Sequence, residues 1–369
     1  MARSEPMAQD STRRALPVAR SVQTVDYHTA GEPFRIVIGG VPALRGATVL
    51  DRRGDARDRL DDVRAFLVNE PRGHADMYGG FVTDPDPGEP AGDGVAALGV
   101  VFFHKDGFST ACGHGTIALA TWALETGVVP ATSPLTRLAV DVPSGRLAVE
   151  ADVGADGRVG EVRFTNVASW VAALDVALDL ALDVERGPAP GGPDRVLADI
   201  AYGGAFYAVV AAAAVGERVA PGSLPALIAH TRRLQAALAG HPAVTHPDDD
   251  RLSGCYGVVW TEPVADGPPL HLRNVTVFAD GEVDRSPCGS GTSARLAVLH
   301  ARGRLPTGAE LCHEGIVGTT FRARVLGTAE GPGGRPAVIT QVGGRAHRTG
   351  YHTFVLDPDD PIGLGFQLR

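Results

Sequence analysis

Two stretches of this chain repeat one pattern: CGHGTIALATWALETG at residues 112–127 and CGSGTSARLAVLHARG at residues 288–303. Aligned without gaps, they share Cys, Gly, Gly and Thr at the first, second, fourth and fifth places, Ala at the seventh, and a closing Gly. The pattern predicts a helix over 115–125 and another over 291–301, because each apolar run ends at a glycine of the kind that caps helix C-termini. One such turn and helix in each part of the chain indicates an internal repeat.

Outside the repeat, most of the chain has the pattern of short strands. Leu and Val alternate with Ala and Asp over residues 173–184, which predicts a strand with one buried face. One further helix is predicted over 224–238, with Pro225 near its start and Gly240 just beyond its end. Few helices among many strands and Gly/Pro turns favour an α+β fold.

The richest run of chain breakers, GPAPGGPD at residues 187–194, predicts a link between two halves of similar size. We expect a first half at 21–190, which carries Cys112, and a second at 191–369, which carries Cys288. The last strand is expected to pack back on the first half. Residues 1–20 are polar, contain four Arg and have no apolar core, so we expect a disordered tail and not a secretory signal.

Composition narrows the class of protein. The chain has 369 residues, 44% of them hydrophobic and 21% charged, as in ordinary globular proteins. A formal net charge of −9 argues against nucleic-acid or anionic-membrane partners. No apolar run approaches the length of a membrane span, and four cysteines in this length are too few for a disulfide framework. We therefore expect a reduced, cytoplasmic enzyme.

Cys112 and Cys288 carry the chemistry that the repeat predicts. A cysteine at a helix N-terminus lies at the positive end of the helix dipole, which favours the thiolate. The adjacent glycines let a ligand approach the free backbone N–H groups, which suit a carboxylate. Two such thiols facing one ligand from opposite sides form the acid and base that inversion of a carbon stereocentre requires.

Other interpretations of these cysteines explain less. Cys255 and Cys312 are interpreted as small buried apolar residues, and a structural role is also possible for either repeat cysteine taken alone. His114 invites comparison with Cys–His proteases, but such a site explains neither Cys288 nor the repeat. No Cys-x-x-Cys is present for redox chemistry, and no cysteine pair has the spacing of a zinc site.

Seven stretches of the chain match one family: DYHTAGEPFR (26–35), EPRGHADMYGG (70–80), GFSTACGHGTIAL (107–119), DIAYGGAFY (199–207), DRSPCGSGTSAR (284–295), HEGIVGTTF (313–321) and the tail from Thr349. Through them the sequence resembles the proline racemase family, which includes 4-hydroxyproline 2-epimerases and trans-3-hydroxy-L-proline dehydratases. The resemblance implies a diaminopimelate-epimerase-like fold of two pseudo-symmetric halves, each a curved, mostly antiparallel sheet around a central helix. It also implies an enzyme without pyridoxal phosphate or another cofactor, and without a metal.

The resemblance also implies roles for individual residues. Cys112 and Cys288 correspond to the two catalytic thiols, and His114 and Asp284 to the side chains that hold the substrate's ring nitrogen. The alternatives are a capping or core role for His114 and an N-terminal helix cap for Asp284. For Gly31, Glu32, His74 and Asp76 we favour a structural or pocket-wall role. The backbone N–H groups that would receive the carboxylate are those of Gly113, His114, Gly289, Ser290 and Gly291.

One position separates the branches of the family. Dehydratases have threonine where Cys288 stands, so Cys288 favours a racemase or epimerase. The stretches 70–80 and 107–119, in contrast, look more like the dehydratase branch. We weight Cys288 more heavily and predict a racemase or epimerase that inverts Cα of a proline-type imino acid, 4-hydroxyproline first and proline second. The alternatives are a trans-3-hydroxy-L-proline dehydratase and a non-catalytic amino-acid-binding protein. Either a monomer or a homodimer fits.

Overall fold

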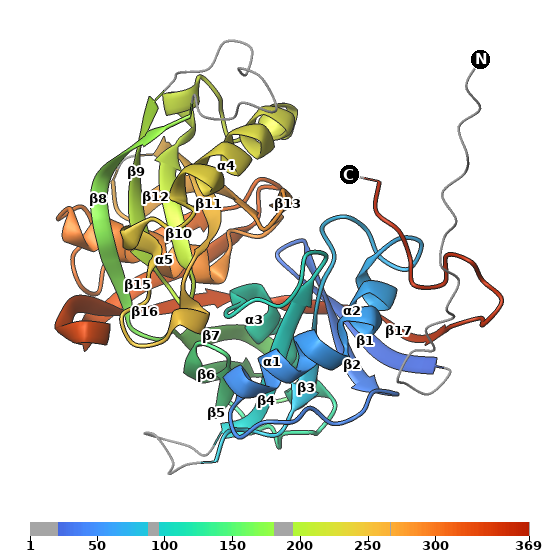
Figure 1. The fold of residues 1–369 in the computed structure, drawn as a ribbon. Coiled ribbons are helices and arrows are strands. Elements are labelled where there is room, and N and C mark those ends of the chain that lie inside the picture. The colour runs from blue at the N-terminus through green and yellow to red at the C-terminus, as the bar shows by residue number, and fades with distance from the viewer. Residues whose placement is uncertain (1–20, 88–95, 181–194, 266, 369) are drawn as a thin grey trace, which may run out of the picture.

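The chain is divided between two lobes that meet along strand β16 (Figure 1). The computed structural model describes residues 21–87, 96–180, 195–265 and 267–368. The expected tail at 1–20 and the expected link at 187–194 lie outside these residues. Within the described ranges the chain forms five α-helices and seventeen strands, so the α+β expectation is confirmed.

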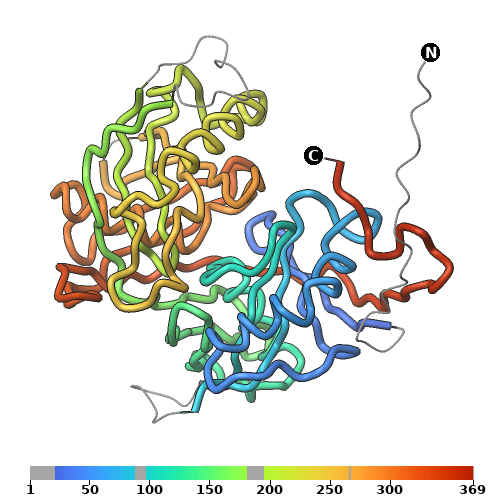
Figure 2. The backbone as a smooth tube through the Cα atoms, in the orientation of Figure 1, coloured from blue at the N-terminus to red at the C-terminus, as the bar shows by residue number. Residues whose placement is uncertain are grey.

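The first lobe holds helix α3 among strands from both ends of the chain. Strand β17 returns from the second lobe and pairs antiparallel with β1 from Ser21↔Val355 to Thr29↔Ala346, which Figure 2 shows as red tube beside blue. The elements of this lobe are β1 (Ser21–Thr29), β2 (Glu32–Gly39), α1 (Val49–Arg59), α2 (Asp61–Val68), β3 (Tyr78–Thr83), β4 (Ala96–His104), α3 (Gly113–Glu125), β5 (Leu135–Val142), β6 (Gly145–Val153), β7 (Val159–Thr165) and β17 (Ala346–Val355).

The second lobe holds helix α5 in a comparable position, packed against β8, β9, β10, β15 and β16. Strand β16 (Arg335–Gly344) pairs with β15 and also with β7 and β8, so it belongs to both lobes. The other elements of this lobe are β8 (Ser169–Asp179), β9 (Arg195–Tyr202), β10 (Phe206–Ala211), α4 (Leu224–Leu238), β11 (Cys255–Ala265), β12 (Leu270–Phe278), β13 (Glu282–Val283), α5 (Gly289–Ala301), β14 (Glu310–Glu314) and β15 (Thr320–Gly331).

The three predicted helices are present as α3, α4 and α5, and the first and last begin two residues earlier than predicted. Helices α3 and α5 are buried over almost their whole length, since each is the centre of its lobe. Their residues pack into the largest apolar cluster, which extends through both lobes. The two helix N-termini are thereby fixed near the junction of the lobes.

Two local predictions need correction. Helices α1 and α2 were not predicted, because α1 (VLDRRGDARDR) has only a thin apolar stripe; it begins instead at a capping box between Thr48 and Asp51. The part of the predicted alternating strand at 173–179 is present in β8, whereas 181–184 lie outside the described residues. Leu178 and the following Leu180 are buried, but Leu174 is 39% exposed. Asp175 has a positive φ of 52° where the register with β9 shifts, so the alternation does not continue to Leu174.

Among the described residues, no helix has both the length and the apolar character needed to cross a membrane.

Candidate active site

Cys112 is the N-cap of α3 and lies at the junction of the lobes. Its Sγ accepts the backbone N–H of Gly115 at 3.2 Å and lies 3.5 Å from a ring nitrogen of His114. Gly115 is needed here, because a Cβ at this position would lie 2.7 Å from Sγ and 2.5 Å from the ring of Phe34. The turn therefore brings the thiol into contact with backbone and imidazole at the same time.

Cys288 is the N-cap of α5, in a backbone conformation that is unusual for cysteine. Its φ is +63°, a left-handed value that L-residues adopt only at a cost. Its Sγ accepts the N–H of Gly291 at 3.4 Å and lies 3.9 Å from the Tyr207 hydroxyl and 4.0 Å from the Ser290 hydroxyl. Strain of this kind concentrates at functional sites.

The two turns are in direct contact with each other. A Cβ on Gly113 would lie 2.5 Å from Cα of Gly289, and a Cβ on Gly289 would lie 2.6 Å from Cα of Gly113. Both hypothetical atoms would also meet the ring of Phe164, at 2.9 and 3.0 Å. Only glycine fits at these two positions, so the structure brings together the paired turns that the repeat predicts.

Burial dominates the protonation of both thiols. It raises the pKa of Cys112 well above the usual value, although the N–H of Gly115 lowers it. Burial, together with the charge of Asp284, raises the pKa of Cys288 to about 12. The expectation that the helix N-terminus makes these cysteines thiolates therefore needs correction, because in this site desolvation outweighs the helix end.

His114 is the second residue of α3 and is buried against two aromatic rings. It meets Tyr78 and Phe34 edge to face, with ring centroids 5.0 and 5.9 Å away, and its carbonyl accepts the Thr29 hydroxyl at 2.9 Å. Burial lowers the pKa of His114 to about 3, so the imidazole is neutral. Its Nδ1 lies 3.9 Å from Oδ2 of Asp284, although the two residues come from different lobes.

Asp284 lies in the segment between β13 and α5. Its Oδ1 accepts the N–H of Ser286 at 2.8 Å. The cap of α5 is Cys288, so the alternative role of Asp284 as that cap is not what the structure shows. Burial raises the pKa of Asp284 to about 6, although the bonds from Ser286 lower it. Near neutral pH the carboxylate is thus mostly ionised inside a buried site.

The predicted carboxylate-binding N–H groups differ in availability. Gly113 and His114 occupy the first two positions of α3, and Gly289 and Ser290 those of α5, where N–H groups have no intrahelical acceptor. The N–H of Gly291 instead donates to the sulfur of Cys288. Four of the five predicted groups can therefore receive a ligand, and the fifth supports the thiol.

Four aromatic side chains beside the thiols were not predicted from the sequence. The Tyr207 hydroxyl bonds Ser290 Oγ at 2.6 Å, and the Tyr78 and Tyr256 hydroxyls bond each other at 2.9 Å from opposite lobes. Phe278 stacks on Tyr256 at 5.4 Å. Tyr207 closes one of the quoted family stretches, but strand alternation alone does not say which tyrosines face the thiols.

One further cluster of polar side chains contains none of the predicted site residues. His104, Asp106 and Glu282 place possible ligand atoms within 4.8 Å of one another. Lys105 forms an ion pair with Asp106 at 2.9 Å, and His104 bonds Glu282 at 2.7 Å, so all three groups already have protein partners.

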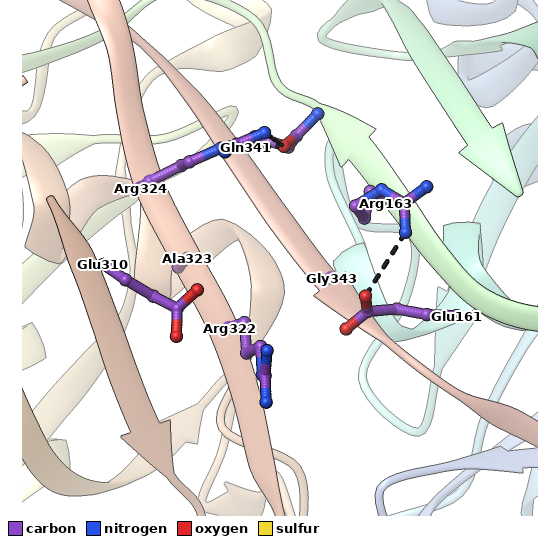
Figure 3. Close-up of a pocket in the computed structure, with 8 residues that line it drawn as sticks. All are labelled: Glu161, Arg163, Glu310, Arg322, Ala323, Arg324, Gln341 and Gly343. Carbon is purple, nitrogen blue, oxygen red and sulfur yellow. Dashed lines mark hydrogen bonds and ion pairs between the residues drawn. The ribbon is translucent and has the colours of Figure 1, made fainter. Parts of the chain in front are cut away.

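A surface groove of about 180 Å³ contains none of the predicted site residues (Figure 3). It is lined by Glu161, Arg163, Glu310, Arg322, Ala323, Arg324, Gln341 and Gly343.

Comparison with known proteins finds one family over nearly the whole described chain. A family model described as proline racemase matches residues 24–367. The chain is 43% identical to a 3-hydroxyproline 2-epimerase of Burkholderia multivorans over 355 residues, which is 96% of this chain and all of that protein. It is 42% identical, over the same shares of the two chains, to a trans-3-hydroxy-L-proline dehydratase of Burkholderia ambifaria.

A solved structure shares the fold. A hydroxyproline epimerase from Agrobacterium vitis, with bound trans-4-hydroxy-L-proline, superposes with a TM-score of 0.83 at 31% identity. The match covers 95% of this chain and 96% of that one.

Proposed function

The chain belongs to the proline racemase family of isomerases, and from this premise we propose that it inverts Cα of a proline-type imino acid through Cys112 and Cys288. One observation supports this proposal above the others: two cysteine-capped helices meet at Gly113 and Gly289 with no room for a Cβ between them. An imino acid bound at that contact would have one cysteine-capped helix end on each side, which suits proton transfer at both faces of Cα.

The two thiols divide the proton transfers. One sulfur, as thiolate, removes the α-proton, and the opposite thiol delivers its own proton to the other face of Cα. After one turnover the protonation states of the two sulfurs are exchanged, so the reverse direction uses them in reversed roles. Because Asp284 raises the pKa of both thiols, a ring ammonium bound beside it lowers both pKa values and helps to form the thiolate.

The carboxylate takes up the charge that forms at Cα. Loss of the α-proton moves negative charge into the carboxylate as an enediolate, and preorganised N–H groups stabilise such charge without reorganising. The N–H groups of Gly113, His114, Gly289 and Ser290 belong to two helix N-termini, whose dipoles add to the effect. This chemistry uses only the protein's own groups.

Asp284 and His114 bind the ring nitrogen in this mechanism. Asp284 supplies the negative charge for the ring ammonium, and neutral His114 supplies an acceptor close to it. The retained positive charge on nitrogen also acidifies the α-carbon. Inversion therefore depends on Asp284 being ionised.

For the substrate, the relatives favour 3-hydroxyproline over the 4-hydroxyproline that the resemblance places first. The 3-hydroxyproline enzymes are 42–43% identical to this chain, whereas the epimerase with bound 4-hydroxyproline is 31% identical. The same relatives include a dehydratase, so dehydration of trans-3-hydroxy-L-proline is the second candidate. Cys288 favours inversion, because a threonine hydroxyl is too weak an acid to protonate the second face.

The domain organisation forms part of the same proposal. We propose that the two lobes are halves related by a pseudo-twofold axis, as in diaminopimelate-epimerase-like folds. Strand β8 (Ser169–Asp179) pairs with β9 and packs on α5 in the second lobe, so we place the boundary between the halves before Ser169 and not at the expected 190/191. Helices α3 and α5 support this, since each spans thirteen residues, begins one residue after its cysteine and forms the centre of its lobe.

Proton NMR in D₂O with reduced enzyme tests the function. L-proline, trans-4-hydroxy-L-proline and trans-3-hydroxy-L-proline are incubated separately. Growth of the opposite Cα epimer with an intact ring hydroxyl establishes an epimerase and identifies its substrate. Loss of the 3-hydroxyl with formation of a pyrroline carboxylate establishes the dehydratase instead. No change in any tube, with both thiols free, would favour a binding protein.

A further inference from the structure

Two buried carboxyl groups of the first lobe hold the backbone on both sides of Asp284. The N–H of Val283 donates to Oδ1 of Asp76 at 3.0 Å, and the N–H of Arg285 donates to Oε2 of Glu32 at 2.7 Å. Glu32 begins β2 and Asp76 precedes β3, whereas Asp284 belongs to the second lobe. The residues on either side of Asp284 are thus both held from across the junction.

The remaining N–H groups of this segment are held from within its own lobe. The N–H of Asp284 donates to the carbonyl of Thr276 at 2.9 Å, and that of Ser286 donates to the Asp284 carboxylate. The N–H of Cys288 in turn donates to the Ser286 hydroxyl at 3.1 Å. A shift at Val283 or Arg285 therefore moves the carboxylate and is passed on toward Cys288.

Charge strengthens the contact to Asp76. The Arg285 guanidinium donates to Oδ2 of Asp76 at 2.8 Å and also to the carbonyl of Val283 at 2.8 Å. Asp76 is only 2% exposed, so this ion pair is shielded from screening by salt. Charge-assisted bonds of this kind are about twice as strong as neutral ones.

Glu32 is fully buried and close to the reacting groups. One of its oxygens, Oε1, has no hydrogen-bond partner among the described residues. Burial and the nearby Asp284 raise the pKa of Glu32 well above its ordinary value, although Arg285 lowers it. The oxygen that accepts the Arg285 N–H can do so in either protonation state, so this contact does not depend on the charge of Glu32.

We propose that Glu32 and Asp76 are positioning residues, which fix the Asp284 carboxylate opposite His114 only while the two lobes are in contact. This goes beyond the structural or pocket-wall role expected from the sequence. Because Asp284 acts on the ring nitrogen in the proposed function, the effect of losing either residue falls on ammonium recognition and not on carboxylate recognition.

The test compares two ligands and two pairs of variants. The imino acid substrate has a ring ammonium, whereas pyrrole-2-carboxylate is a planar ring acid without one. We expect Asp76→Ala and Glu32→Ala each to raise KM for the substrate roughly tenfold or more, as for loss of a bond to a charged group. The Kd for pyrrole-2-carboxylate should change less than about threefold, and Glu32→Gln should restore most of the activity, because the amide oxygen still accepts the Arg285 N–H.

Asp141 supplies the matched control. It is also 2% exposed and also accepts an arginine, Arg146 at 2.7 Å, and a backbone N–H, that of Asp86 at 2.8 Å, but away from the thiols. The positioning role is wrong if Asp76→Ala and Glu32→Ala change KM for the substrate no more than Asp141→Ala does. It is also wrong if they weaken the binding of substrate and pyrrole-2-carboxylate equally.

Hydrogen exchange makes the test independent of the substrate. The Val283 amide should exchange faster in Asp76→Ala and the Arg285 amide in Glu32→Ala, with neither changed in Asp141→Ala. Unchanged exchange would overturn the inference whatever the enzyme acts on. Failure of the proposed function itself appears separately, as a wild-type enzyme that neither converts nor binds any of the three imino acids.

Discussion

The Cys112 turn and the Cys288 turn share a sequence pattern and a place at a helix N-cap, yet they differ in backbone and in neighbours. Cys112 has an extended φ of −155° and contacts the imidazole of His114. Cys288 has a φ of +63° and lies beside Tyr207 and Ser290. The repeat therefore sets the position of the two sulfurs, while their different neighbours make the two faces of the site chemically unequal.

The largest expected effect comes from removing either sulfur. We expect Cys112→Ser and Cys288→Ser each to lower the rate of inversion roughly a thousandfold or more, because each thiol transfers the proton on its own face. Cα–H exchange with D₂O can persist in one variant, since one base suffices to exchange a proton from its own side. Cys255→Ser, a free cysteine on β11, is the control and should invert normally. Unchanged inversion and exchange in either variant would contradict the two-thiol mechanism.

The contact between the turns is the next target. Gly289→Ala places a Cβ 2.6 Å from Cα of Gly113, so the two helix ends must separate. A displacement of about 1 Å at an active site can lower the rate roughly a hundredfold, and overpacking typically costs about 1–3 kcal/mol of stability. We expect both effects, measured by kcat and by denaturant unfolding. Gly222→Ala, with open space around it, should show neither.

Removing the charge of Asp284 is expected to weaken substrate binding. Asp284→Asn should raise KM roughly ten- to a hundredfold by removing the charge that binds the ring ammonium. For the wild type, kcat/KM should fall as the pH falls through about 6, the pKa of Asp284, because the protonated carboxyl cannot pair with the ammonium. This acidic limb should be absent from the pH profile of the variant. If the fall in kcat/KM below about pH 6 persists unchanged in the variant, another group is responsible for it.

The same substitution should stabilise the fold at neutral pH. The pKa of Asp284 is raised on folding, so the group stabilises the fold at low pH, and this contribution is lost as the pH rises from about 4 to about 6. The neutral amide of the Asp284→Asn variant would not carry the buried charge, and the free energy of unfolding at pH 7 should increase by on the order of 2 kcal/mol. Chemical denaturation at pH 4 and pH 7 measures the difference, and a loss of stability at pH 7 would contradict it.

The smallest effect is expected at Ser290, which stands where the first turn has His114. Ser290→Thr keeps the hydroxyl that bonds Tyr207 at 2.6 Å, so kcat/KM should change less than about threefold. Ser290→Ala removes that bond and should slow inversion more than Ser290→Thr does. Equal rates for the two variants would show that the Tyr207 contact has no part in the reaction.

The sequence predicted the parts of the molecule that depend on local pattern. Helix α4 lies where its signals place it, and α3 and α5 begin within two residues of theirs, because their caps and apolar runs are short-range features. Helix α1 was missed, because its Arg- and Asp-rich sequence owes its place to a capping box and to tertiary packing.

The long-range contacts of the site could not be predicted from local sequence patterns. Asp76 and Glu32 accept N–H groups 207 and 253 residues away in the chain. Nothing in strand alternation or motif spacing encodes such a pairing. The raised pKa of both thiols likewise follows from burial at the junction of the lobes, which no single segment of sequence contains.

The isotope content of substrate and product at early conversion in D₂O tests the two-thiol account most directly. If one sulfur removes the proton and the other delivers a deuteron, the new epimer carries deuterium at Cα while the unreacted substrate keeps its protium. We predict this unequal distribution for the wild-type enzyme with its preferred hydroxyproline. Product that retains the substrate's own protium, or equal labelling of both pools from the start, would show a single base and contradict the account.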